Sequence, residues 1–261
     1  MLSKSNPTTW EDLQEMVANI LRECKFSVEI EKKIHSARGA VSIDVYAEEQ
    51  VFSRPYIVLC ECKYWKARIP QSIVHGFRTI MSDIGANLGY IITSSYFQSG
   101  AFDASLNTNV RLKTWTEFLE EYEETWLQRY FFPTLTERLD PLFTYTEPLR
   151  LEPVWFELLT ASEKNKYNKL YEKYFDFGNY MFTFSKWARM IESDNSKIKL
   201  PLTDQLAKKN IKENTVNIPR EILEEYAYRE FLKKVLHYGE RAISEFRAIR
   251  DIGMRRDNDH R

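Results

Sequence analysis

Three features are scarce in this chain of 261 residues, and each shortage excludes a class of protein. The three cysteines, Cys24, Cys60 and Cys62, are too few for a disulfide framework, and no second cysteine or histidine pair completes a zinc site. Long apolar runs are missing, so we expect no signal core or membrane span and place the chain in the cytoplasm. Only three of the eight glycines follow Gly100, which predicts long helices with few tight turns in the second half.

An excess of charge of one sign is also missing. The chain has 37 Lys and Arg against 38 Asp and Glu, with a formal net charge of -1. No global basic field therefore indicates a polyanionic partner, and contact with nucleic acid requires a local patch. The sequence has no GxxxxGK[ST] motif, and the glycines of "DIGANLGYIITSS" lack the GxGxxG order. We expect neither a nucleotide-driven motor nor a dinucleotide site in this chain.

The first half of the chain alternates between helix-like and strand-like segments. Helical spacing of apolar residues predicts helices near 9–24, 71–87, 98–108 and 116–131. Alternating or continuous apolar runs predict strands near 26–34, 40–47, 56–65, 88–95 and 110–115. This order predicts an α/β core in which helices cover a mixed sheet.

The second half predicts a mostly helical part. Two long amphipathic helices are expected over 152–191 and 219–249, joined by a polar connector at 192–217. We therefore divide the chain into an α/β domain, 1–130, and a helical accessory domain, 131–261.

One predicted strand, "YIVLCECKYW", carries charged residues among apolar ones. Side chains alternate along a strand, so Leu59, Glu61 and Lys63 share one face. Burying a carboxylate and an ammonium beside an apolar sheet face is costly unless each is paired or holds a metal. A hairpin turn near Val51 would place Asp44, from the preceding strand, opposite Leu59, with Glu61 next along the same face.

Two carboxylates at diagonal positions, about 7 Å apart at their Cβ atoms, can share one hard cation such as Mg²⁺. Lys63 would then lie beside a metal-bound water. The cation can act as a Lewis acid on a phosphodiester, while the lysine orients the nucleophile or stabilises the transition state. An ordinary strand ion pair explains the same spacing, so the spacing alone leaves both interpretations open.

The order of these residues resembles the signature of a nuclease superfamily. Asp44 followed by Glu61, Cys62 and Lys63 resembles the PD-(D/E)XK signature, and the surrounding text is similar to Mrr-like restriction endonucleases. The matching stretches include "WEDLQEMVANIL", "RGAVSIDVYAEE", "VLCECKYWKARIP" and "NVRLKTWTEF", over roughly 9–120. The resemblance implies a restriction-endonuclease-like fold and an endonuclease that cleaves DNA with Mg²⁺, or Mn²⁺ in its place, in restriction or antiphage defence. It also implies Asp44 and Glu61 as metal ligands and Lys63 as the catalytic lysine.

The resemblance does not decide which acidic residue of the first helix is a metal ligand. Gln14 stands where family members frequently have Glu, and Glu11 lies one turn away. We favour Glu11 over Glu15 as a further metal ligand, although both also fit as ordinary acids of a first helical turn. Ser42 stands where close relatives often have Glu, which leaves the number of metals open.

Three further residues are candidates for substrate binding. Gln98 follows a strand and could reach a phosphate or cap the next helix. Lys66 and Arg68 follow the strand of Glu61 directly, so they could contact phosphates or lie in a solvated loop.

Two other functions remain alternatives to a DNA endonuclease. One is a weak or inactive nuclease fold that serves as a scaffold or binding module, and the other is a nuclease that acts on RNA or single strands. The helical part, 131–261, is expected to support a homo-oligomer or a regulatory protein partner, with DNA contact as the second interpretation.

Overall fold

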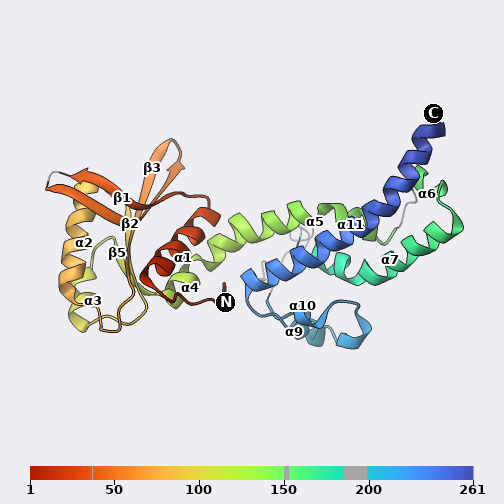
Figure 1. The fold of residues 1–261 in the computed structure, drawn as a ribbon. Helices are drawn as coiled ribbons and strands as arrows, with labels where there is room; N and C mark the ends of the chain where they lie inside the picture. Colours follow the sequence, from red (N-terminus) through yellow and green to blue (C-terminus); the bar gives the residue numbers. More distant parts are fainter. Residues whose placement is uncertain (37, 150–152, 185–198, 261) are drawn as a thin grey trace. The chain divides into compact units, whose positions relative to one another are not determined.

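The computed structural model describes residues 1–36, 38–149, 153–184 and 199–260. Its contacts divide the chain into two compact units (Figure 1), Lys4–Tyr130 and a second unit of Met1–Ser3 with Phe131–Arg261. The first three residues belong to the second unit because the carbonyl oxygens of Met1 and Leu2 accept hydrogen bonds from the backbone N–H groups of Tyr228 and Arg229, at 3.1 and 2.9 Å.

The Lys4–Tyr130 unit is a five-stranded mixed sheet with helices on both faces. Its strands are β1 (Ser27–Ser36), β2 (Gly39–Val51), β3 (Arg54–Lys63), β4 (Leu88–Thr93) and β5 (Val110–Thr114), in that order across the sheet. The pairs β1–β2 and β2–β3 are antiparallel, whereas β3–β4 and β4–β5 are parallel. The α/β fold with a mixed sheet that the sequence predicts is confirmed.

Two helices pack on each face of this sheet. They are α1 (Trp10–Glu23) with α4 (Trp115–Trp126), and α2 (Gln71–Ile84) with α3 (Ser99–Ser105). A π-helical turn, η1 (Leu127–Phe131), follows α4. Helix α1 begins at Thr9, whose side chain accepts a hydrogen bond from the backbone N–H of Asp12, which satisfies one of the free donors of the first turn. Leu13, Val17 and Leu21 are fully buried, so α1 contributes the apolar stripe that covers its side of the sheet.

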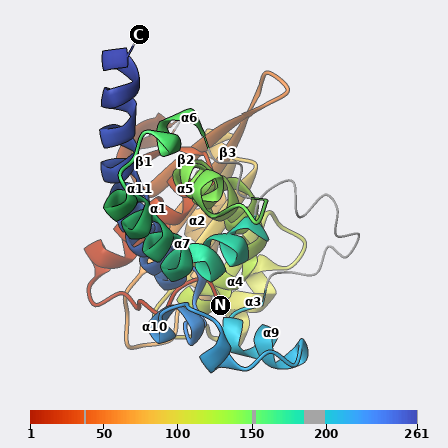
Figure 2. The same ribbon diagram turned by 90° about the vertical axis from the view of Figure 1, so that its right-hand side faces the viewer.

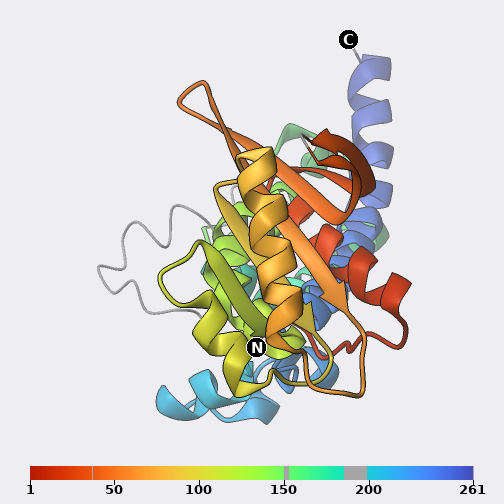
Figure 3. The same cartoon turned by 90° about the vertical axis from the view of Figure 1, so that its left-hand side faces the viewer.

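Helix α2 lies across the other face (Figure 3) and closes a second apolar core. Phe77 and Met81 of α2 pack there with Leu59 and Ile91 from the central strands. The helix approaches β4 closely at Gly89, where an added Cβ would lie 2.7 Å from the Met81 sulfur. A glycine at this position therefore lets α2 pack tightly against the strand next to β3.

The β2–β3 hairpin fixes the register of the charged strand. Its two-residue turn, Phe52 and Ser53, has positive φ at both positions, 48° and 63°, as a type I′ turn requires. The ladder pairs Leu59 with Tyr46. The sequence prediction that Asp44 lies opposite Leu59 is therefore wrong by two residues, because the centre of the turn lies one residue later than expected.

The second unit is mostly helical, as predicted. Its helices are α5 (Phe132–Thr146), α6 (Val154–Glu157), α7 (Ala161–Phe182), α9 (Leu202–Lys208), η2 (Glu213–Thr215), α10 (Arg220–Leu223) and α11 (Tyr228–His260). Helices α5, α7 and α11 pack side by side (Figure 2), around buried aromatic side chains such as Phe131, Phe177, Phe231 and Phe246. At Gly178 of α7, an added Cβ would lie 2.1 Å from the Thr146 hydroxyl oxygen, so α5 and α7 can approach only because this residue has no side chain.

The helix boundaries in this unit differ from those expected. The predicted helix at 152–191 is divided before α7, because Thr160 starts a new helix through a capping box with Glu163. Its expected end, 185–191, lies outside the described residues. The predicted helix at 219–249 is divided before α11, where the Glu225 carboxylate accepts hydrogen bonds from the backbone N–H groups of Tyr226 and Ala227. Helix α9 lies inside the predicted connector. In the part of the chain that the structure describes, no helix has the length and apolarity needed to cross a bilayer.

Candidate active site

Asp44 lies where the strands of the sheet separate. The β2–β3 ladder ends at the pair Val45 and Cys60, and the Asp44 carboxylate accepts a hydrogen bond from the backbone N–H of Cys62 at 2.7 Å. The carboxylate therefore takes the place of a backbone acceptor. On the β1 side, Glu31 stands opposite Asp44 with φ of 51°, and the two residues do not pair in the β1–β2 ladder. This left-handed conformation is costly for a residue with a side chain and marks a local distortion of the sheet beside Asp44.

Glu61 and Lys63 lie on β3 close to this distortion. The Lys63 ammonium forms an ion pair with the Glu61 carboxylate, and the two side chains are 16% and 21% exposed, respectively. The Lys63 carbonyl oxygen accepts hydrogen bonds from the Thr93 hydroxyl, at 3.0 Å, and from the backbone N–H of Ser94, at 3.2 Å. The end of β3 is therefore held against β4, which fixes the backbone from which Lys63 projects.

The carboxylates of Asp44 and Glu61 influence each other. The pKa of Asp44 is raised from 3.8 to about 6, first by burial and then by the Glu61 charge, while the Cys62 N–H and the Lys63 ammonium oppose the rise. Repulsion between two partly buried carboxylates is relieved when a cation lies between them. The chemistry of these oxygen donors fits a hard divalent cation.

Helix α1 directs an amide at this site. Gln14 is 3% exposed, and its side chain lies close enough to Asp44 to lower the pKa of that carboxyl. Its Nε2 atom is buried without a hydrogen-bond partner within the described residues. The acceptor that this donor faces is the Asp44 carboxylate, so Gln14 lies beside that carboxylate as a neutral donor.

The two candidate acids of the same helix are not buried at this site. Glu11 and Glu15 are exposed, and Glu15 forms an ion pair with Arg22 at 3.0 Å. The described residues contain no group of three or more His, Cys, Asp or Glu side chains arranged to hold a metal. The structure thus brings Asp44 and Glu61 together, and a metal role for Glu11 stays a prediction.

The three predicted substrate-binding residues lie in neighbouring loops after β3 and β4. Lys66, Arg68 and Gln98 are all exposed. An isolated bridge between Ile69 and Phe97 joins the two loops, which places Arg68 and Gln98 beside it. Gln98 is the N-cap residue of α3, but its side chain makes no capping hydrogen bond, so its amide is available for another partner.

Sequence reasoning missed a cleft at the carboxyl ends of β3, β4 and β5. The cleft has a volume of about 580 Å³. Its lining is rich in hydroxyl groups, from Tyr64, Thr93, Ser94, Ser95, Tyr96, Thr114 and Thr116. The cleft begins at Tyr64, directly after Lys63. Ligands usually bind at the carboxyl ends of the parallel strands in such sheets. This rule could have predicted the position of the cleft from the predicted strands.

Comparison with known proteins assigns the unit that carries this site. Its mixed sheet with helices on both faces agrees with the expected nuclease fold. The Mrr_cat family model, a restriction endonuclease, matches residues 6–121. The match covers less than half of the chain, so it identifies residues 6–121 as a restriction endonuclease domain, and the expected resemblance is confirmed for this part.

Two solved structures are similar to the chain at low identity. One is a protein of unknown function, AF1548, with 14% identity, 90% of this chain and 99% of that chain covered, and a TM-score of 0.39. The other is the DNA modification-dependent restriction endonuclease AspBHI, with 12% identity and a TM-score of 0.24. That match covers 49% of this chain and 38% of the other. Comparison with curated proteins gives no match.

Proposed function

We propose that the chain is a metal-dependent endonuclease that hydrolyses DNA phosphodiester bonds in restriction or antiphage defence. One observation carries the proposal. A restriction endonuclease domain places Asp44 and Glu61 near each other, with Lys63 paired to Glu61 at the end of β3.

Asp44 and Glu61 are the residues that would hold Mg²⁺, or Mn²⁺ in its place. When bound, the cation supplies a Lewis acid that activates water and stabilises charge on the phosphate. The chain's own contribution is to hold two oxygen donors in place, since the Cys62 N–H fixes Asp44. Burial favours Gln14 over Glu11 as the group of the first helix that orders this site.

Lys63 is the proposed catalytic lysine. Its ammonium is held by Glu61, and the hydrogen bonds to its carbonyl oxygen fix the strand end. From there the ammonium can hold the attacking water in line or stabilise negative charge that develops on the phosphate. An ammonium in a partly buried site is more effective in this role than one in water, because the effective dielectric constant is lower.

The loops after β3 and β4 are the proposed contact with the nucleic acid backbone. Lys66, Arg68 and Gln98 are exposed there, and the hydroxyl groups of the adjacent cleft can donate hydrogen bonds to phosphate oxygens. This local patch is needed because the net charge of the chain is -1.

The test is cleavage by the full chain and by its Lys63→Ala variant. Supercoiled plasmid, phage DNA with modified bases and structured RNA are incubated with Mg²⁺, Mn²⁺ or EDTA. We expect wild type to cut DNA only with metal, and the variant to be slower by about 10² or more. Cutting of RNA alone would change the substrate class, and equal cutting by the variant would contradict the assignment of Lys63.

A scaffold function is the second candidate, and Gln14 is the observation that favours it. A neutral amide on the first helix leaves the site with two carboxylates, which weakens metal binding. In that case the helical unit would recruit a protein partner or a second copy of the chain. A scaffold would show no Mg²⁺ or Mn²⁺ binding that depends on Glu61. The three buried cysteines form no disulfide, which fits a reducing compartment such as the cytoplasm.

A further inference from the structure

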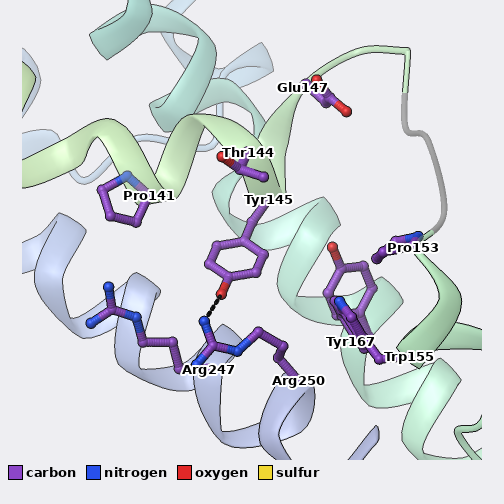
Figure 4. A pocket seen from close by; sticks show the side chains of 9 residues that line it. All are labelled: Pro141, Thr144, Tyr145, Glu147, Pro153, Trp155, Tyr167, Arg247 and Arg250. Atoms are coloured by element: carbon purple, nitrogen blue, oxygen red, sulfur yellow. Dashed lines mark hydrogen bonds between the residues drawn. The ribbon is translucent and has the colours of Figure 1, made fainter. Parts of the chain in front are cut away.

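A pocket in the helical unit gathers aromatic rings and two arginines (Figure 4), and it lies within Phe131–Arg261. Its volume is about 310 Å³, at the lower end of the range, roughly 300–1,000 Å³, in which small-molecule sites fall. Helices α5, α6, α7 and α11 each supply lining residues. The residues are Pro141, Thr144, Tyr145, Glu147, Pro153, Trp155, Tyr167, Arg247 and Arg250.

The aromatic wall is held rigidly. Tyr145 stacks on Phe246 with ring centroids 4.8 Å apart and an angle of 7° between the rings. Tyr167 packs edge to face against Trp155, at 5.8 Å, and against Phe246, at 5.3 Å. The three lining rings are each less than a tenth exposed. Such a wall offers a planar ligand an apolar surface that costs little conformational entropy on binding.

The cationic side of the pocket is formed by α11. The Arg247 guanidinium is exposed and has no hydrogen-bond or ion-pair partner within the described residues. Arg250 binds the Asp251 carboxylate, at 2.7 Å, and donates a weaker hydrogen bond to the Tyr145 hydroxyl, at 3.4 Å. Glu147 is the acid of the pocket, and Figure 4 shows it away from both arginines. Arg247 is therefore the cation of the pocket that has no acidic partner within the described residues, whereas Asp251 already neutralises Arg250.

We infer that this pocket binds a single nucleotide, with the base against the aromatic wall and the phosphate on Arg247. A guanidinium binds phosphate oxygens through two parallel N–H donors, and aromatic side chains stack on bases of any sequence. The volume admits one nucleotide and excludes a duplex. The ligand is a free nucleoside monophosphate or a nucleotide of a single strand. The inference does not depend on the proposed cleavage chemistry.

The experiment measures binding to the full chain carrying Lys63→Ala, so that cleavage does not interfere. The probes are deoxynucleoside monophosphates, a deoxynucleoside, inorganic phosphate and a short single-stranded oligonucleotide, each titrated by calorimetry. We expect the monophosphate to bind at least tenfold more tightly than either the nucleoside or phosphate. Arg247→Ala and Trp155→Leu should each weaken this binding at least tenfold. Arg255→Ala, an exposed arginine of the same helix outside the pocket, should leave it unchanged.

The outcomes distinguish a free nucleotide from a nucleotide within a single strand, and they also test whether the pocket binds nucleotides at all. Competition by the oligonucleotide, lost in Arg247→Ala, would identify a nucleotide within a strand. Binding of the monophosphate alone would identify a free nucleotide. The inference would be overturned if neither the monophosphate nor the oligonucleotide binds, or if Arg247→Ala does not weaken their binding. Arg247→Ala should leave the fold intact, because Arg247 is exposed and makes no hydrogen bond or ion pair within the described residues.

Discussion

The carboxylate of Asp44 should destabilise the metal-free protein, and replacing it should stabilise the fold. The pKa of Asp44 rises from 3.8 to about 6 in the folded state, chiefly through burial and then through the Glu61 charge. Each unit corresponds to about 1.4 kcal/mol, so the full shift is about 3 kcal/mol. Because the side chain is partly exposed, solvent screening reduces the expected effect to about 1–2 kcal/mol. Asp44→Asn keeps the acceptor for the Cys62 N–H and removes the charge.

The sign of the pH dependence follows from the raised pKa. The unfolded chain ionises near pH 3.8 and the folded chain near pH 6, so the carboxylate lowers stability at neutral pH and has little effect near pH 4. Relative to wild type, Asp44→Asn should gain stability as the pH rises from 4 to 7 and hold that gain above pH 7. A catalytic site that lowers stability is expected where function requires buried charge.

The assay must report the nuclease unit separately, because the chain has two compact units and need not unfold in one step. Urea-dependent hydrogen exchange of peptides from β2 and β3, in EDTA, gives the free energy of unfolding of this unit. Asp103→Asn is the matched control, since Asp103 is exposed on α3. Addition of Mg²⁺ should stabilise wild type more than Asp44→Asn. A gain that is equal at pH 4 and pH 8, or no gain, would show that the buried Asp44 carboxylate does not lower the stability of this unit.

Three further predictions test other parts of the structure. Gln14→Glu adds a third carboxylate to the site and should tighten Mn²⁺ binding by roughly tenfold in calorimetry; unchanged affinity would contradict the placement of Gln14. Gly178→Ala would set a Cβ 2.1 Å from the Thr146 hydroxyl oxygen and should cost about 1–3 kcal/mol in urea unfolding, whereas Gly76→Ala, which meets no atom within 4 Å, should cost nothing. Arg68→Ala should lower the slope of log affinity for DNA against log salt by about 1; an unchanged slope would remove Arg68 from the interface.

The sequence predicts the chemistry of β3 because strand alternation is a local property. Glu61 and Lys63 share a face on any register, and the fold class followed from the order of segments. The register itself was wrong because Phe52 and Ser53 adopt left-handed conformations that glycine or asparagine would have indicated. The hydroxyl-rich cleft was missed because its residues come from the ends of three strands that are distant in the sequence.

In the helical unit, too, local features could be predicted from the sequence, whereas contacts between distant residues could not. The "TASE" segment contains the capping box of Thr160 and Glu163, so the start of α7 could have been predicted from the sequence. The nucleotide pocket could not, because Tyr145, Trp155 and Arg247 belong to three helices. Their juxtaposition depends on packing, and amphipathic periodicity specifies only which face of each helix is buried.

Asp44 and Glu61 are proposed to hold a divalent cation beside Lys63. Calorimetric titration of Mn²⁺ into wild type, Glu61→Gln and Lys63→Ala tests this arrangement. We predict one metal-binding process in wild type, at least tenfold weaker in Glu61→Gln, because that variant replaces one of two charged ligands. Lys63→Ala should bind as well as wild type or better, because its ammonium no longer competes for Glu61. Equal Mn²⁺ affinity in wild type and Glu61→Gln would show that Glu61 does not bind the metal.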